Sequence, residues 1–371
     1  MAQMDSQLRD LQPGEWEHHA ACWLAWPAAA DLWQEDLEKA QIEFTNLCRV
    51  ISDWDERANL CRGEKLEILV PDEKAERAAA RALRNLNFRF HRIPYGDIWL
   101  RDTAPIFVRT PGGAIAPARF RFNGWGEKYV LPHDDQVSAR VAEAYLKLRE
   151  PQGDPAASAA VLLPAGEEVI LEGGSIDVDG EGTALTTEQC LLNPNRNPSL
   201  SREEIEKQLA DSLGIQKTLW VREGLLNDHT DGHIDTIARF VAPGVVVCMV
   251  PASEADPNFR VLLQIRDELR SFTDARGRSL RVIEIPSPGK VLDEEGEIMP
   301  ASYVNFYIGN RTVAVPNYGT AADEAATSVI AKLFPDRRTV GLSAKAILTG
   351  GGAFHCITQQ QPSEASAKGT A

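Results

Sequence analysis

Residues 231–250, DGHIDTIARFVAPGVVVCMV, combine a polar cluster with the pattern of a β-hairpin. Apolar residues dominate 234–240 and 245–250, and the Pro243-Gly244 pair between them favours a tight turn. We therefore predict two strands that follow directly on the polar cluster at 231–233. This stretch decides the fold because its layout recurs along the chain.

Three other segments repeat the order of polar cluster, strand, glycine-bearing turn and second strand. They cover 101–120, 172–192 and 303–316. Helical signals lie between them: Ser201 and Glu204 form a capping box, and Gly214 is placed to end that helix. Further helices are predicted at 32–51, 73–86, 259–272 and 323–334. The sequence thus predicts an α/β fold of irregular repeats.

The repeats begin near 101, 172, 231, 301 and 350, and the last one is cut short by the end of the chain. We expect the strand around 23–26 to complete it and close a ring of five units. In such a ring the polar clusters at the strand starts converge on one central region.

Composition limits the function classes. The net charge of −15 argues against nucleic-acid binding, which needs clustered lysine and arginine. There is no run of about 18 apolar residues and no secretory signal, so we expect neither a membrane span nor export. The six cysteines are scattered and mostly have apolar neighbours, a pattern typical of reduced thiols in a cytoplasmic enzyme.

Cys356 is the first candidate for chemistry. It follows three glycines in the segment GGGAFHCITQ at 350–359, which permits close backbone approach. A cysteine in this setting is either an inert core residue or a nucleophile. The repeats predict that other polar residues lie near it.

His233 and Asp235 are spaced i, i+2, so on a strand both side chains point to one face. They are either an acid/base and a charge anchor or a structural pair. Asp102, beside Trp99, is either a turn residue or a carboxylate that holds a flat cation. Glu172, before two glycines, and Asn305 are further candidates for substrate contact or for local structure.

A metal site is an alternative reading of the same region. His229 and His233 lie four residues apart among several carboxylates, and Cys356 could complete a zinc ligand set. The intervening glycine and the strand-like residues that follow disfavour a helix that presents both histidines. We therefore expect no metal.

Two carboxylates beside a cysteine and a histidine suit a guanidinium, which offers five donors and one delocalised charge. A serine-protease-like site normally uses one carboxylate to orient its histidine. The residues therefore favour attack by cysteine on a guanidinium carbon, with the histidine protonating the departing ammonia.

Five ordered motifs, which span nearly the whole chain, carry a family resemblance. They are EWEH at 15–18 with LAWP at 24–27, WLRDT at 99–103, EGGS at 172–175, TDGHID at 230–235 and GGGAFHCITQQ at 350–360. The chain resembles the agmatine deiminases and bacterial-type peptidylarginine deiminases of the guanidine-modifying superfamily. The resemblance implies a five-bladed pseudo-symmetric α/β propeller (pentein) of ββαβ-type units, formed as one domain by residues 1–361. We expect residues 362–371 to be a disordered tail.

The resemblance also implies roles. Cys356 is the expected nucleophile, His233 the general acid/base, and Asp102 and Asp235 the guanidinium clamps. The expected reaction converts agmatine and water to N-carbamoylputrescine and ammonia through a covalent thiouronium intermediate, without a cofactor. Trp99, Glu172 and Asn305 are expected to bind or shape the substrate site, and the resemblance suggests a homo-oligomer.

One departure affects the expected substrate. Ala353-Phe354 stands where agmatine deiminases commonly carry Asn-Ile, so a possible amide hydrogen bond is lost. Peptidyl-arginine or another guanidine is therefore the alternative substrate. A metal-dependent hydrolase and a non-catalytic pentein that only binds a partner are the remaining hypotheses.

Overall fold

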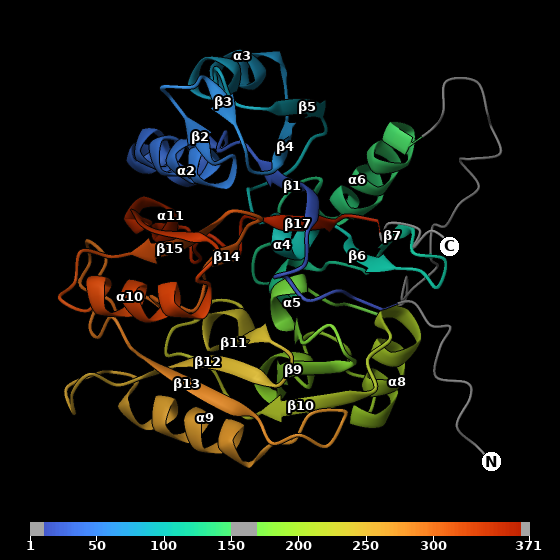
Figure 1. The fold of residues 1–371 in the computed structure, drawn as a ribbon, viewed down its shortest axis with the longest axis vertical. Helices are drawn as coiled ribbons and strands as arrows, with labels where there is room; N and C mark the ends of the chain where they lie inside the picture. Colours follow the sequence, from blue (N-terminus) through green and yellow to red (C-terminus); the bar gives the residue numbers. More distant parts are fainter. Residues whose placement is uncertain (1–10, 150–168, 365–371) are drawn as a thin grey trace.

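The computed structural model describes residues 11–149 and 169–364 of the 371-residue chain. Within the described ranges, no helix is both long enough and apolar enough to cross a membrane. The fold is mixed α/β, and several small sheets are arranged around the middle of the molecule with most of the longer helices outside them (Figure 1).

Three sheets in the described part share one topology: two antiparallel strands, a helix, and a third strand parallel to the second. Their strands are β8 (Asp177–Val178), β9 (Thr183–Thr187) and β10 (Lys217–Val221); β11 (Ala238–Ala242), β12 (Val245–Val250) and β13 (Arg281–Pro286); and β14 (Tyr307–Ile308), β15 (Thr312–Asn317) and β16 (Arg338–Ser343). The connecting helices are α8 (Arg202–Leu213), α9 (Phe259–Ser271) and α10 (Asp323–Leu333). The predicted hairpins and helices are confirmed here.

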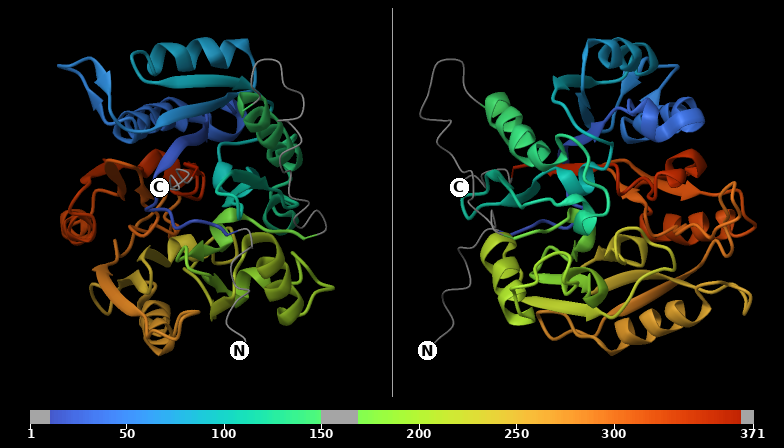
Figure 2. Two further views of the ribbon diagram at one scale, coloured as in Figure 1. Left: turned by 45° about the vertical axis from the view of Figure 1, so that its right-hand side comes forward. Right: turned by 180° about the vertical axis from the view of Figure 1, so that it is seen from behind.

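The first and last strands meet in one sheet. β1 (His19–Ala25) pairs antiparallel with β17 (Gln359–Pro362) and parallel with β4 (Lys65–Val70), which continues to β5 (Phe88–Arg92). The expectation that an N-terminal strand completes the last repeat is therefore confirmed. In Figure 2 the segment before β1 passes through the middle of the molecule.

After β5 the chain repeats the order of two antiparallel strands and a helix, but without a full third strand. β6 (Ile106–Arg109) pairs antiparallel with β7 (Ile115–Ala118), and α6 (Asp134–Arg149) comes next. Where the other sheets have a third strand, an isolated parallel bridge joins Arg121 and Ile170. The remaining elements are α1 (Ala30–Trp33), η1 (Gln34–Asp36), α2 (Leu37–Ile51), β2 (Trp54–Asp55), β3 (Leu60–Cys61), α3 (Glu73–Ala82), α4 (Leu100–Thr103), α5 (Gly124–Glu127), η3 (Gly173–Ser175), α7 (Glu188–Leu191), η4 (Ile234–Thr236) and α11 (Lys345–Thr349).

Local signals explain where the helices lie. α8 begins with the predicted capping box of Ser201 and Glu204, and Gly214 ends it in the left-handed conformation. α9 buries Leu262, Ile265 and Leu269, which form one stripe along the helix and face the core.

Several predicted boundaries are wrong, and the structure gives a local reason for three of them. The strand expected to reach 192 ends at Thr187, because its side chain accepts a hydrogen bond from the backbone of Cys190 and starts α7. The helix expected at 32–51 is interrupted at Gln34, whose φ is 45°. The predicted start of the C-terminal tail, residue 362, is too early in the chain. Pro362 belongs to β17, and the backbone N–H of Ser363 donates a hydrogen bond to the carbonyl of His18. Residues 365–371 lie outside the described residues.

Candidate active site

Asp102 lies in α4, next to the segment that carries the cysteine. The backbone N–H of Arg101 donates to the carbonyl of Cys356 at 3.1 Å. The Asp102 carboxylate accepts hydrogen bonds from the indole of Trp125 at 2.8 Å and from the backbone of Gly174 at 2.9 Å. Burial raises the pKa of Asp102; the charge of His233 opposes this rise, and nearby carboxylates add to it.

Gly173 and Gly174 bring η3 against the site. A Cβ on Gly174 would lie 2.6 Å from His233 Nδ1 and 2.9 Å from Asp102 Oδ1, so a larger residue there would displace these two side chains. A Cβ on Gly173 would lie 2.2 Å from the carbonyl of Arg101. The two glycines therefore let the backbone of η3 approach the site closely.

His233 is the N-cap of the 3-10 helix η4 and Asp235 lies within it, so their prediction on a strand is wrong. Asp231 and Gly232 both have positive φ and turn the chain before η4. The carbonyl of His233 then accepts from the hydroxyl of Thr236 at 2.8 Å, and β11 begins only at Ala238. Both side chains nevertheless reach the same site, because each lies close to Gly174.

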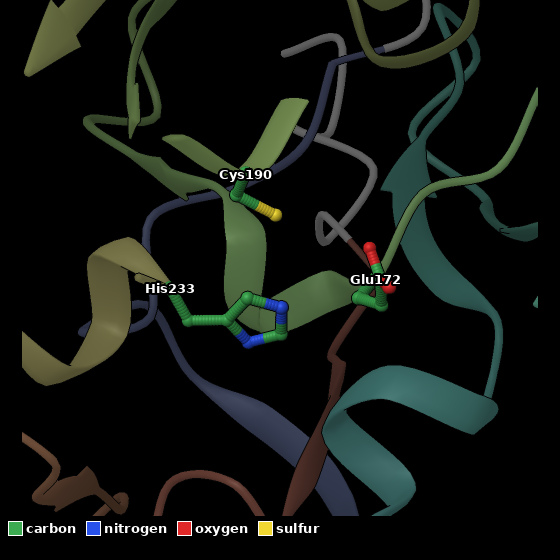
Figure 3. A group of neighbouring side chains, drawn as sticks. All are labelled: Glu172, Cys190 and His233. Atoms are coloured by element: carbon green, nitrogen blue, oxygen red, sulfur yellow. The ribbon is translucent and has the colours of Figure 1, made fainter. Parts of the chain in front are cut away.

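Negative groups surround the imidazole of His233, which is buried. Its Nδ1 lies 3.8 Å from Asp102 Oδ1, and Figure 3 shows the ring extending between Cys190 and Glu172. Neither ring nitrogen has a hydrogen-bond partner among the described residues. Burial lowers the pKa of His233, but Asp102, Cys190 and Glu172 outweigh it and raise the pKa to about 10.

Glu172, Cys190 and His233 also carry the ligand types that zinc accepts. One ligand atom from each lies within 4.8 Å of the others. One carboxylate oxygen of Glu172, however, accepts from Arg196 Nε at 2.6 Å, which places a positive charge beside the group. Among the described residues, these three have ligand atoms close enough together to hold a metal ion. His229, His233 and Cys356, the set of the alternative hypothesis, do not.

Asp235 joins the cysteine to a second histidine. Asp235 Oδ2 lies 2.6 Å from His355 Nδ1 and 3.6 Å from Cys356 Sγ. The other ring nitrogen of His355 lies 2.9 Å from Glu15 Oε2. Burial raises the pKa of Asp235, but the hydrogen bond and charge of His355 hold it below its ordinary value. Asp235 Oδ1 has no partner in the described part of the chain.

Cys356 follows α11 and the three glycines. A Cβ on Gly352 would lie 3.1 Å from Cys356 Sγ and 2.7 Å from the ring of Trp99. Asn305 Nδ2 donates to Sγ at 3.1 Å, and Asn305 Oδ1 accepts from the backbone of His355 at 3.0 Å. Burial, with the charges of Asp235 and Asp102, raises the pKa of Cys356 well above that of an ordinary thiol.

A cavity of about 260 Å³ opens onto Asp102 and Cys356, whereas His233 and Asp235 are not part of its wall. Its wall includes Trp33, Asp97, Trp99, Asp102, Trp125 and Cys356. Trp99 is thus at the cavity, as predicted for a substrate contact. Glu172 and Asn305 are not in its wall, and their contacts are with Arg196 and with Cys356.

Several residues of the site escaped the sequence reasoning. Trp125, Cys190 and Arg196 belong to no predicted functional cluster. His355 and Glu15 belong to the quoted motifs, but no sequence pattern assigns either a role. The contact between them joins residues 340 positions apart. Adjacency of His355 to the cysteine was the one signal that could have drawn attention to it.

Comparison with known proteins identifies the family. The Porphyromonas-type peptidyl-arginine deiminase model matches residues 11–362. An agmatine deiminase of Ectopseudomonas mendocina is 36% identical over 374 residues, which cover 94% of this chain and 95% of that protein. The chain therefore belongs to the Porphyromonas-type peptidyl-arginine deiminase family, and it is an enzyme, a hydrolase of carbon–nitrogen bonds in amidines.

Solved structures agree with this assignment. The agmatine deiminase of Enterococcus faecalis has a TM-score of 0.83 at 32% identity, with 96% of each chain covered. A C. jejuni agmatine deiminase, solved as a cysteine-to-serine variant with substrate bound, has a TM-score of 0.82 at 27% identity and covers 96% of this chain and 97% of that one. An amidinotransferase of Microseira wollei, 13% identical with a TM-score of 0.51, shares the fold.

Proposed function

We propose that this enzyme hydrolyses agmatine to N-carbamoylputrescine and ammonia, with Cys356 as the nucleophile. The observation that carries the proposal is a cysteine at the end of an aromatic cavity, with one carboxylate on the cavity wall and a second in contact with its sulfur. Two carboxylates and a thiol in this arrangement are complementary to a flat cation with an electrophilic central carbon. Relatives named agmatine deiminase support this choice of substrate.

The guanidinium is held by Asp102 and Asp235. Asp235 Oδ1 has no partner among the described residues and is free to accept from a guanidinium N–H. The incoming cation offsets the negative charges that keep Cys356 protonated, so substrate binding lowers the pKa of the thiol and favours the thiolate. The nucleophile is therefore activated mainly in the complex with substrate.

The reaction then proceeds in two steps. The Cys356 thiolate attacks the guanidinium carbon, and the tetrahedral adduct expels ammonia as His233 donates a proton to it. Neutral His233 next takes a proton from water, whose oxygen attacks the thiouronium carbon. The hydroxyl proton of the second adduct passes to solvent as the carbon–sulfur bond breaks, which restores the thiolate and releases the urea product. General acid–base catalysis of this kind contributes about 10²- to 10⁴-fold.

Two further residues support this chemistry without touching the substrate. Asn305 holds the cysteine sulfur and the backbone of the segment that carries it. Glu172, fixed by Arg196, adds negative charge beside His233 and helps to keep the imidazole protonated. Both are proposed as positioning residues.

At the level of the fold, we propose that the repeated units form a five-bladed α/β propeller and act as one catalytic domain. The three sheets of identical topology, the shared sheet of β1 and β17, and the reduced β6–β7 unit support this arrangement. The propeller places the starts of the hairpins at its axis, where the polar side chains gather.

The test is ammonia release from agmatine, free arginine and an arginyl peptide, each with and without a chelator. We expect chelator-resistant activity on agmatine that Cys356→Ser abolishes and that Cys61→Ser, a change at a half-buried cysteine of β3, retains. Turnover by Cys356→Ser would contradict the mechanism. Loss of activity with the chelator would favour a metallohydrolase, preference for the peptide would favour the alternative substrate, and no turnover of any guanidine would favour a binding protein.

A further inference from the structure

The cavity has two ends, joined by the indole of Trp99. A Cβ on Gly352 would lie 2.7 Å from this indole and 3.1 Å from Cys356 Sγ. A Cβ on Gly350 would lie 2.7 Å from the same indole and 2.8 Å from the ring of Trp33. Trp99 therefore extends along the glycine segment from the cysteine to Trp33, and the cavity follows it.

A single carboxylate stands at the second end, on the side away from the cysteine. Asp97 accepts a hydrogen bond from Trp99 Nε1 on one oxygen and from Trp33 Nε1 on the other, both at 2.8 Å. The two indoles are stacked, with centroids 6.2 Å apart and planes 27° apart. The carboxylate is fixed in place and lines the cavity. The backbone of Ile98 also donates to it, and its remaining lone-pair position can accept a further hydrogen bond.

This carboxylate has no cationic partner. Among the described residues, no lysine, arginine or histidine forms an ion pair with Asp97, and the cavity wall contains no lysine or arginine. Asp31 adds further negative charge nearby, and burial raises the pKa of neighbouring Asp134 to about 7. A buried carboxylate without a counter-charge is unfavourable, and a cation that enters the cavity relieves this.

We infer that Asp97 determines substrate specificity by binding a cationic group at the end of the substrate opposite the guanidine. The inference rests on the proposed function and extends it to the distal end. An ammonium fits because Asp97 supplies charge and hydrogen bonds, while the faces of Trp33 and Trp99 offer cation–π contact. A carboxylate at the same position, as in free arginine, meets like charge.

The experiment compares Asp97→Asn with the unmodified enzyme on agmatine and on n-pentylguanidine, in which a methyl group replaces the ammonium. A hydrogen bond to a charged group corresponds to about a 10- to 100-fold change. We expect Asp97→Asn to lower kcat/KM for agmatine by about this factor, mainly through KM, and to change kcat/KM for n-pentylguanidine by less than about threefold. The exposed Asp135→Asn on α6 is the matched control and should change neither.

An equal loss on both substrates would show that Asp97 only holds the two tryptophans, and would overturn the inference. A second measurement separates this inference from the proposed function. Calorimetric titration of Cys356→Ser with agmatine and n-pentylguanidine, with and without Asp97→Asn, reports binding without turnover. Absence of turnover by the unmodified enzyme contradicts the proposed function. Agmatine binding that is absent, or that Asp97→Asn does not weaken, contradicts the role of Asp97.

Discussion

Cys356 is a buried thiol. Its sulfur contacts the carboxylate of Asp235, and the negative charge of Asp102 also acts on it. Burial and the charges of Asp235 and Asp102 disfavour the thiolate, while the hydrogen bond from Asn305 favours it only in part. The resting sulfur is therefore protonated near neutral pH. In the proposed mechanism the substrate cation supplies the missing charge, and so we expect an uncharged amidine to be a poor activator of Cys356.

This resting state predicts how Cys356 reacts with iodoacetamide. The pKa of Cys356 lies well above that of an ordinary thiol. At pH values below this pKa, the thiolate fraction is small and rises about tenfold per pH unit. Between pH 7 and 9, we expect the alkylation rate to increase without a plateau. Asp102→Asn removes one negative charge and should raise the rate at pH 8.

Mass spectrometry of the peptide that contains Cys356 measures this rate, with the peptide of half-buried Cys61 as an internal reference. A plateau below pH 8 would show that the free enzyme already holds a thiolate, contrary to the proposed activation by substrate.

Helices and strands whose start, stop and periodicity can all be seen in the sequence form where they were predicted. α8 has its own start, stop and periodicity, and it forms between the predicted residues. η4 has the apolar alternation of a strand, but the positive φ angles of Asp231 and Gly232 bend the chain before it. The hydroxyl of Thr187 donates to the carbonyl of Gly232 at 2.7 Å and holds this bend, and no pattern within 231–240 shows that contact.

The cap of α8 gives a prediction for a single element. Ser201→Ala removes the acceptor for the backbone of Glu204 and should lower the free energy of unfolding by about 1 kcal/mol. Urea denaturation measures this change. Because α8 contributes no side chain to the cavity wall, kcat/KM should remain unchanged. A loss of activity without a loss of stability would show that α8 influences the site in some other way.

Across the whole molecule, Glu15 connects distant parts of the chain. Its Oε2 accepts from Arg239 at 2.7 Å and lies 2.9 Å from His355 Nε2 and 3.5 Å from Arg101. These partners come from β11, from the cysteine segment and from α4. Burial raises the pKa of Glu15, but these positive charges hold it well below its ordinary value.

Glu15→Gln tests this central network. The change removes one of the two carboxylates that pair with buried Arg239. Because Asp177 still pairs with it at 2.7 Å, the cost is that of a lost hydrogen bond to a charged group, about 1.5–3 kcal/mol. We expect a loss of this size in the free energy of unfolding, measured by urea denaturation. Glu17→Gln, at the half-buried pair with Arg109, is the control and should cost about 1 kcal/mol or less. Equal effects of the two changes would contradict a central role for Glu15.

The sequence by itself determined the hairpins and the main helices, because turn residues, caps and periodicity act within a few neighbours. It also singled out Cys356, His233, Asp102 and Asp235 as candidates, because each lies in a recognisable motif. Only the tertiary structure decided that Glu172 and Asn305 stand behind the cavity and that Asp97 stands within it. It also showed that His355 links Asp235 to Glu15. These facts depend on contacts between residues far apart in the chain, where packing and buried charge select the partners and leave no local pattern.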